Sequence, residues 1–233
     1  MGLRRFNLAG RRRWYLARNV GGMQIAQELS QTPWMQHLER VSSSHFYLEP
    51  VSNSLFKISR DKYSPRAHFW RWLSRDIISQ RLAGGLDALK EYLSNRTLAR
   101  LGQRTIDVRL YGVALNPFNP LGSLYAMEFL ADCSTGREYF ERLDETARIA
   151  FMARFCDLVI ELAEAGFYHR DLHLTNIMVD EAENIIWIDT HIKRLPKAAA
   201  ERTKILDKTL IPYNFYNEKY MEMARRQLIP HFS

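Results

Sequence analysis

The sequence contains few cysteines, no long apolar run and no glycine-rich phosphate loop. Its two cysteines, Cys133 and Cys156, form no CxxC pair, which argues against a disulfide framework, a zinc site and thioredoxin-like chemistry. No stretch approaches the roughly 20 apolar residues that span a bilayer. No apolar run follows the N-terminal arginines, so a secretory signal is not expected. The sequence therefore predicts a protein of the reducing cytosol.

The composition excludes disorder and fibrous structure. The chain has 233 residues, of which 46% are hydrophobic and 25% charged, as in ordinary globular proteins. It has no internal repeats and no low-complexity linker. This length fits one sizeable domain or two small lobes.

The net charge of +7 is unevenly distributed. Residues 1–18 hold six arginines and no acid, and residues 57–75 hold six basic residues against Asp61 alone. The rest of the chain has an excess of acid. These two basic patches suit the phosphates of nucleic acid, anionic lipid or a substrate. A solvated basic face is the alternative.

Hydrophobic periodicity and turn residues predict an α+β chain. Residues 1–35 read as a basic lead-in with a break at Gly21-Gly22. The expected strands are two within 40–59, then 106–115, 123–130, 176–179 and 185–188. The expected helices are a basic amphipathic one at 65–83, interrupted by Gly84-Gly85, one at 86–101, one from Asp144 as N-cap to Gly166, and one after Asn217. A β-rich part with an inserted helix pair thus precedes a helical part.

The most informative stretch is FYHRDLHLTNIMV at 167–179, followed by IIWID at 185–189. Asn176 comes five residues after Asp171, and Asp189 comes eighteen after it. Phosphoryl transfer needs one carboxylate at the nucleophile and hard oxygen ligands for Mg²⁺. The loop resembles the H-R-D-L-x-x-x-N catalytic loop of protein-kinase-like enzymes at every fixed position. A capped polar turn without a ligand is the alternative.

Two residues upstream fit the same pattern. The strand Ser54-Leu55-Phe56-Lys57-Ile58 resembles the V-A-I-K strand, whose lysine contacts the α- and β-phosphates of ATP. Glu91 on the following predicted helix is our choice for its ion-pair partner. The alternatives are a strand-edge lysine and a solvated glutamate.

Residues 124–130 resemble the fifth strand and hinge of the same enzymes. Backbone groups from Glu128 to Leu130 are expected to meet adenine, with Met127 behind it. Met127 is equally compatible with an ordinary core position.

The sequence also departs from the kinase pattern. No G-x-G-x-x-G precedes Lys57, and Ser43 and Ser44 occupy the turn expected to cover the phosphates. The D-F-G position reads Asp189-Thr190-His191. Only 44 residues follow Asp189, without an A-P-E motif, so a kinase with protein substrates is disfavoured.

Over roughly residues 40–215 the sequence resembles the bacterial lipopolysaccharide core kinases, which phosphorylate heptose or Kdo sugars of the inner core. The segments that carry this resemblance are Lys90-Glu91-Tyr92 with Leu98 and Gly102, Tyr111 to Ala114 with Asn116-Pro117, Ala165 to Asp171, Ile188 to Arg194, and Asp207 to Ile211. The family also has a basic, aromatic insertion between the lysine strand and the glutamate helix, which matches residues 60–84.

The resemblance implies a bilobal protein-kinase-like fold with a β-rich N-lobe and a shortened helical C-lobe. The expected division is a lead-in at 1–35, an N-lobe at 36–130 with the insertion at 60–84, and a C-lobe at 131–233. ATP is expected in the cleft between the lobes.

The implied activity is Mg-ATP-dependent transfer of the γ-phosphate to a core sugar hydroxyl. In it, Lys57 orients the α- and β-phosphates, Asn176 and Asp189 bind Mg²⁺, and Asp171 accepts the hydroxyl proton. His173 either touches the γ-phosphate or acceptor, or packs within the loop.

The expected partners are the lipopolysaccharide core with lipid A and the anionic cytoplasmic face of the inner membrane. There the protein would bind peripherally through the basic patches, and nucleic acid is not expected. Packing of Trp70 and Trp72 against the N-lobe is the alternative to membrane contact. Two other functions stay open: a phosphotransferase for a soluble small molecule or a protein, and a pseudokinase-like module that binds lipid or nucleic acid. The sequence does not select the sugar, the hydroxyl or the oligomeric state.

Overall fold

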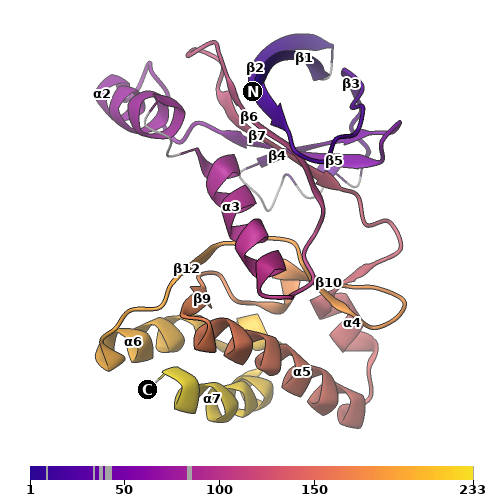
Figure 1. Cartoon of the computed structure of the whole chain (residues 1–233), viewed down its shortest axis with the longest axis vertical. Helices are drawn as coiled ribbons and strands as arrows, with labels where there is room; N and C mark the ends of the chain where they lie inside the picture. Colours follow the sequence, from indigo (N-terminus) through magenta and orange to yellow (C-terminus); the bar gives the residue numbers. More distant parts are fainter. Residues whose placement is uncertain (9, 34, 37–38, 40–43, 83–85, 233) are drawn as a thin grey trace. The chain divides into compact units, whose positions relative to one another are not determined.

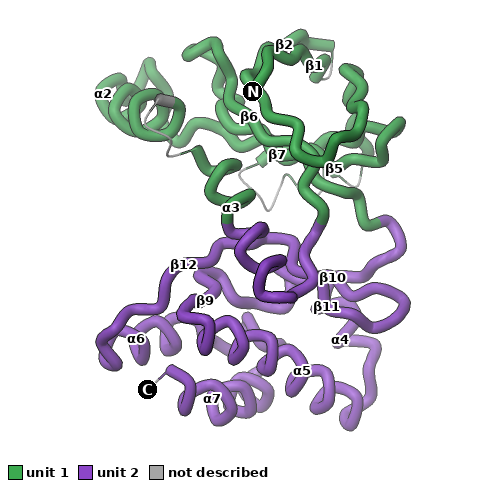
Figure 2. Tube along the Cα trace, in the orientation of Figure 1, with its two compact units in different colours: residues 1–93, 107–130 green, residues 94–106, 131–233 purple. Residues whose placement is uncertain are grey.

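The computed structural model describes residues 1–8, 10–33, 35–36, 39, 44–82 and 86–232. The chain divides into two compact units, which Figure 2 colours separately. Unit 1 comprises residues 1–93 and 107–130, and unit 2 comprises residues 94–106 and 131–233. Each unit is described by itself.

Unit 1 is built on a seven-stranded sheet (Figure 1). Its strands are β1 (Gly2–Leu8), β2 (Arg11–Asn19), β3 (Glu28–Leu29), β4 (Ser44–Glu49), β5 (Ser54–Arg60), β6 (Val108–Ala114) and β7 (Leu121–Glu128). The spatial order is β3-β1-β2-β6-β7-β5-β4. All neighbouring pairs except β1–β3 are antiparallel. The four strands expected in this region are confirmed.

This sheet closes on itself. Ser30, directly after β3, forms a bridge with Leu48 of β4, and each backbone N–H donates to the other residue's carbonyl at 2.9 and 2.8 Å. The inward side chains form one apolar core, in which Phe6, Phe56 and Leu124 are buried. Closure leaves the two end strands of the sheet paired at this point.

The first two strands of this sheet lie in the segment that the sequence analysis treated as a lead-in. Phe6 and Leu8 of β1 and Tyr15 and Ala17 of β2 are buried, while Asn7 and Leu16 between them are partly exposed. This alternation of period two is the signature of a strand with one buried face. Dense arginines conceal it, because they dominate the composition of the segment.

The insertion between β5 and α3 is helical, as expected. It comprises a short α2 (Phe69–Arg71) and a π-helical segment η1 (Trp72–Leu82). The expected break at Gly84-Gly85 lies outside the described residues. Helix α3 (Asp87–Arg100) follows, and the boundary between the units falls within it. On this helix Leu93 is exposed, whereas Glu91 is buried.

Unit 2 is mainly helical. Its helices are α4 (Gly136–Arg142), α5 (Glu145–Glu164), α6 (Ala199–Thr209) and α7 (Glu218–Phe232), with the short turns η2 (Leu174–Asn176) and η3 (Pro212–Phe215). Its short strands are β8 (Ser134–Thr135), β9 (Phe167–His169), β10 (Ile177–Val179), β11 (Ile185–Trp187) and β12 (Ile192–Arg194).

The predicted central helix of this unit is confirmed at both ends. The Asp144 carboxylate accepts from the N–H of Ala147 at 2.8 Å, as an N-cap does. Gly166 follows the helix with a φ of +81°, a conformation that glycine adopts without strain. The helix after Asn217 is also confirmed, whereas α6 was not predicted.

The core of unit 2 forms where α5 packs against α7 and β9. Phe155, Trp187 and Leu228 are fully buried in it, and the Phe155 and Trp187 rings lie 5.8 Å apart. Within the described residues, no helix combines the length and apolar character needed to cross a membrane. The described chain is thus α+β, with a sheet-rich unit 1 and a helix-rich unit 2, as predicted.

Replacing Gly136 with alanine is expected to destabilise unit 2 by about 2 kcal/mol, the usual cost of overpacking a tight core. A Cβ atom there would lie 2.5 Å from Cγ1 of Ile177 and 2.6 Å from the carbonyl oxygen of Leu174. Urea unfolding measures the effect. Gly2→Ala is the control, because a Cβ at Gly2 meets nothing within 4 Å. Equal midpoints for both variants would contradict this packing.

Candidate functional site

Lys57 and Glu91 form an ion pair within unit 1. The Nζ of Lys57 donates to both carboxylate oxygens of Glu91 at 3.1 and 3.2 Å. The Glu91 side chain is 5% exposed and the Lys57 side chain 17%. Because both charges are largely removed from water, each one requires the other.

The first half of α3 is fixed on the sheet near this pair. The backbone N–H of Ala88 donates to Oγ of Ser123 on β7 at 3.2 Å. One turn further along, the Tyr92 ring stacks on Tyr111 of β6, with centroids 4.8 Å apart. These two contacts flank Glu91 along the helix and hold its carboxylate toward β5.

In unit 2, the predicted catalytic loop connects β9 to η2 and β10. The backbone N–H of Arg170 donates to the carbonyl of His191 at 2.8 Å, so the loop is joined to β12. The Asp171 side chain is about half-exposed and open to solvent. The adjacent Leu172 is buried in the core and anchors the loop.

Asn176 and Asp189 come from neighbouring segments of this unit. Nδ2 of Asn176 donates to the backbone carbonyl of Asp171 at 2.6 Å. The N–H of Ile188, next to Asp189, donates to the Asn176 carbonyl at 3.2 Å. With its side-chain nitrogen engaged, Asn176 has its Oδ1 oxygen left for a cation. An amide oxygen and carboxylates are the donors that Mg²⁺ prefers, so this set fits the predicted metal.

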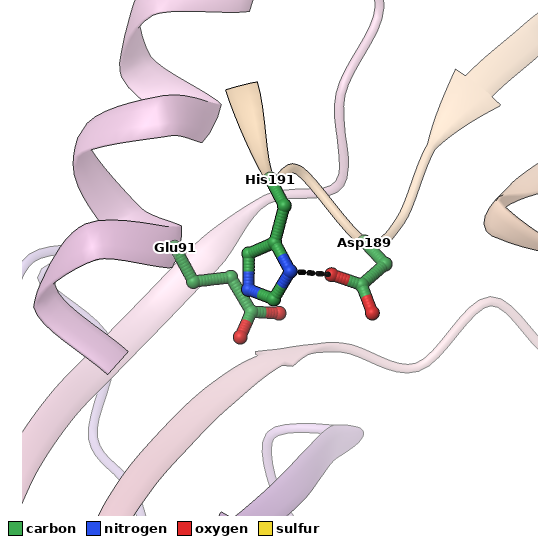
Figure 3. Close-up of side chains that lie close together, drawn as sticks. All are labelled: Glu91, Asp189 and His191. Carbon is green, nitrogen blue, oxygen red and sulfur yellow. Dashed lines mark ion pairs between the residues drawn. The ribbon is translucent and has the colours of Figure 1, made fainter. Parts of the chain in front are cut away.

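His191 also belongs to this site, and the sequence analysis assigned it no role. Its Nδ1 lies 3.3 Å from Oδ2 of Asp171 and 3.6 Å from Oδ1 of Asp189; Figure 3 shows the second contact as a dashed line. Glu91, also labelled there, belongs to unit 1 and to the pair with Lys57. The sequence feature that could have indicated His191 is its position, because it is the third residue of the segment that matches D-F-G.

His169 packs behind the predicted catalytic loop. It is buried, stacks on Trp187 with centroids 5.0 Å apart, and contacts the Asp189 carbonyl through Nε2 at 2.6 Å. Since a carbonyl only accepts, Nε2 carries the proton; Nδ1 has no hydrogen-bond partner among the described residues. Burial lowers the pKa of His169 to about 4, so the ring is neutral at pH 7.

Acidification is therefore expected to destabilise the protein through His169. The unfolded chain binds this proton below its ordinary pKa of about 6.5, whereas the folded chain binds it only near pH 4. The contribution is present above pH 6.5 and is lost as the pH falls toward 4, with a total of about 3 kcal/mol. Urea unfolding at several pH values measures the slope. His169→Gln should flatten it, and an unchanged slope would contradict the assignment.

The remaining predicted nucleotide contacts are placed as follows. Ser43 lies outside the described residues. Ser44 begins β4, is buried, and has its Oγ 3.3 Å from Oγ of Ser59. His173 is partly buried beside η2, where its Nδ1 bonds to Oγ1 of Thr175. Burial lowers the pKa of His173.

The predicted hinge is partly engaged in backbone bonds of unit 1. The N–H of Glu128 donates to the Asp107 carbonyl at 2.9 Å, and that of Phe129 donates to the Asn53 carbonyl at 3.0 Å. Met127 is buried and Leu130 is half-buried at the end of this segment.

No protein-family model matches the chain, and neither does any curated protein. Among solved structures, the chain is similar to WaaP in complex with acyl carrier protein, at 14% identity over 89% of both chains and a TM-score of 0.49. It is also similar to the bifunctional kinase-methyltransferase WbdD, at 14% identity and a TM-score of 0.48. That match covers 98% of this chain and 48% of WbdD, so the chain spans about half of its length.

A third similar structure is the PknI kinase domain of Mycobacterium tuberculosis, at 13% identity and a TM-score of 0.40, over 84% of this chain and 77% of that one. The chain itself has the parts of a protein-kinase-like fold. A sheet lysine pairs with a helix glutamate in unit 1, and unit 2 has an H-R-D loop followed by a hairpin and an aspartate. The predicted fold class agrees with this arrangement.

Proposed function

We propose that this protein transfers the γ-phosphate of ATP to a hydroxyl of a heptose or Kdo sugar in the lipopolysaccharide inner core. The observation that carries the proposal is the catalytic loop of unit 2. There Asn176 is bonded to the Asp171 backbone, and its own carbonyl is bonded to the segment that presents Asp189. The loop thus holds an amide oxygen donor, Asn176, close to the segment of the carboxylate donor Asp189 and to the exposed carboxylate of Asp171.

Asp171 is proposed as the catalytic base. Its carboxylate would orient the acceptor hydroxyl and take its proton as the oxygen attacks phosphorus. His191, 3.3 Å from this carboxylate, would hold it in one rotamer. Asn176 and Asp189 would hold Mg²⁺, which neutralises charge on the phosphates when bound.

In unit 1, Lys57 is proposed to contact the α- and β-phosphates. Glu91 would fix the direction of the ammonium group through their ion pair. The N–H groups of Glu128 and Phe129 are used within the unit, so the proposed N–H donor to adenine is that of Leu130. Carbonyl oxygens of the segment from Glu128 to Leu130 remain the proposed acceptors, with Met127 beside the base. Ser44 and His173 remain proposed neighbours of the phosphates.

The proposed setting is the cytoplasmic face of a bacterial inner membrane, with peripheral attachment to anionic lipid. The positive charge of residues 1–18 and 57–75 supports this location, because basic residues near an anionic surface are attracted to it. The acceptor would then be a lipid-linked oligosaccharide.

The experiment is a transfer assay with purified protein, Mg²⁺ and γ-labelled ATP. The acceptors are dephosphorylated core lipopolysaccharide, free sugars and a generic protein substrate. Label on the core, located by mass spectrometry, supports the proposal, and mass spectra of core from a deletion strain should lack the same phosphate. Label only on a free sugar or on protein would instead identify the soluble-substrate alternative.

A thermal-shift measurement separates an enzyme from a binding module that does not use nucleotide. A ligand at one hundred times its Kd stabilises the native state by about 2.7 kcal/mol. Mg-ATP is expected to raise the melting temperature of the wild type, and Asp189→Ala should remove most of that shift. No shift with the wild type would contradict nucleotide binding.

A further inference from the structure

The two basic segments of the sequence meet in unit 1 at one turn, residues 116–120 between β6 and β7. From one side, Arg13 of β2 bonds through its guanidinium to the side-chain oxygen of Asn119. From the other side, Trp72 of the second basic segment stacks on Phe118 of the turn, and Arg81, further along η1, donates to the backbone carbonyls of Asn116 and Asn119 at 2.9 and 2.8 Å. Segments that are far apart in the sequence are thus joined through a single loop.

Aromatic rings continue outward from this junction. Trp72 is buried and stacks on Phe118 of the turn, with centroids 5.7 Å apart. Phe69 lies 5.8 Å from Trp72 and 5.4 Å from Trp70. At the outer end, Trp70 is 77% exposed and Phe118 is 71% exposed. Two large rings are therefore exposed to solvent and packed at their bases against other rings.

Within residues 57–82, the segment that carries most of these rings, the exposed charge is of one sign. Residues 57–82 contain two acids, Asp61 and Asp76. The Asp61 side chain, 9% exposed, forms an ion pair with Arg81 at 2.7 Å, and Asp76 is buried against Arg75. With both acids neutralised inside the fold, the exposed ionic side chains are arginines and lysines. Those of this segment include Arg66 and Arg71.

We infer that the surface formed by Phe69, Trp70, Phe118, Arg66 and Arg71 binds an anionic lipid bilayer. Trp and Phe side chains enter the headgroup region because they combine apolar area with an interfacial preference. The arginines around them would meet lipid phosphates. This aromatic–basic surface is the part of unit 1 that would contact the membrane.

Exposed aliphatic groups favour a bilayer over a nucleic-acid strand. Leu115 and Pro117 are exposed beside Phe118, and aliphatic side chains gain nothing from base stacking but gain free energy in an acyl layer. Between the insertion and the turn there is also a hollow of about 300 Å³, whose lining includes Lys62, Trp72 and Phe118. A basic group beside apolar walls suits a lipid headgroup and its first acyl carbons.

This inference rests on the proposed function and assigns the membrane contact to one surface of unit 1. The binding test is independent of catalytic turnover. The full-length protein is floated with vesicles of phosphatidylcholine alone and with vesicles that also contain phosphatidylglycerol. Arg66→Glu/Arg71→Glu is expected to weaken binding to the anionic vesicles on the order of thirtyfold or more. Trp70→Ala/Phe118→Ala should weaken binding to both vesicle types.

The matched controls lie in unit 2. Lys204→Glu/Arg226→Glu makes the same charge change at exposed positions, and Tyr213→Ala removes an exposed ring; both should bind like the wild type. Melting curves check that every variant is folded. Phosphate transfer to a soluble acceptor fragment should be unchanged in the surface variants, so loss of binding and loss of chemistry are read separately.

Two results would overturn the inference. One is equal loss of vesicle binding in the surface and control variants, which would indicate a diffuse charge effect. The other is unchanged vesicle binding with lost binding to a single-stranded oligonucleotide in Arg66→Glu/Arg71→Glu, which would assign the surface to nucleic acid.

Discussion

Asp171→Asn is expected to lower the rate of phosphate transfer by roughly a thousandfold, the scale of general-base catalysis. Asparagine keeps the size of the side chain but cannot accept the acceptor's proton. Asp171 is also half-exposed and outside the unit 2 core, so the fold should persist. Single-turnover transfer with saturating Mg-ATP measures the effect, because it reports the chemical step.

The control for this variant is Asp132→Asn, which removes an exposed carboxylate outside the loop and should retain full activity. Mg-ATP should still stabilise Asp171→Asn thermally, because Asn176 and Asp189 are intact. If Asp171→Asn turned over near the wild-type rate, Asp171 would not be the catalytic base. If Asp171→Asn lost both turnover and nucleotide binding, Asp171 would instead be a ligand of Mg-ATP.

Lys57→Met is expected to reduce transfer on the order of a hundredfold and to destabilise unit 1 by about 3 kcal/mol. The first effect follows from the loss of a donor aimed at phosphate charge. The second follows because the Glu91 side chain, 5% exposed, would be left as a buried charge without its lysine. Transfer kinetics and urea unfolding measure the two effects independently.

The double variant Lys57→Met/Glu91→Leu separates structure from function. Replacing both charges of a buried pair by apolar groups often restores stability, so unfolding should return close to the wild type. Transfer should remain at the level of Lys57→Met. Recovery of activity along with stability would mean that the pair serves the fold alone.

The parts of this protein that were predictable from the sequence are those whose signals are local. Asp144 caps α5 through a residue three positions away, and Gly166 ends the helix through its own backbone freedom. Asp171 and Asn176 lie in one loop, so their spacing alone predicted their proximity. In the same way, Glu91 follows Lys57 on the next long helix.

The parts that were not predictable depend on distant partners. The strand character of β1 and β2 is fixed by pairing of β2 with β6, for example Tyr15 opposite Ala114. The many arginines on these strands favoured a basic lead-in, and the alternation of buried and exposed residues was too weak to indicate strands. His191 became part of the site only because β12 pairs with β9, which brings it to Asp171. The D-F-G slot marked the position of His191 in the sequence but not its contact with Asp171, and the pairing of β2 with β6 leaves no motif.

The closed sheet of unit 1 has a consequence for how the chain folds during synthesis. β2 and its partner β6 are about 100 residues apart in sequence, as Tyr15 opposite Ala114 shows. At translation rates of about 5 to 20 residues per second, the first hairpin waits roughly 5 to 20 seconds for its neighbour. During that time Phe6 and Tyr15, fully buried in the finished sheet, have no core to enter. Slow elongation should therefore lengthen the exposure of this hairpin to chaperones, and refolding of unit 1 should be limited by long-range strand pairing.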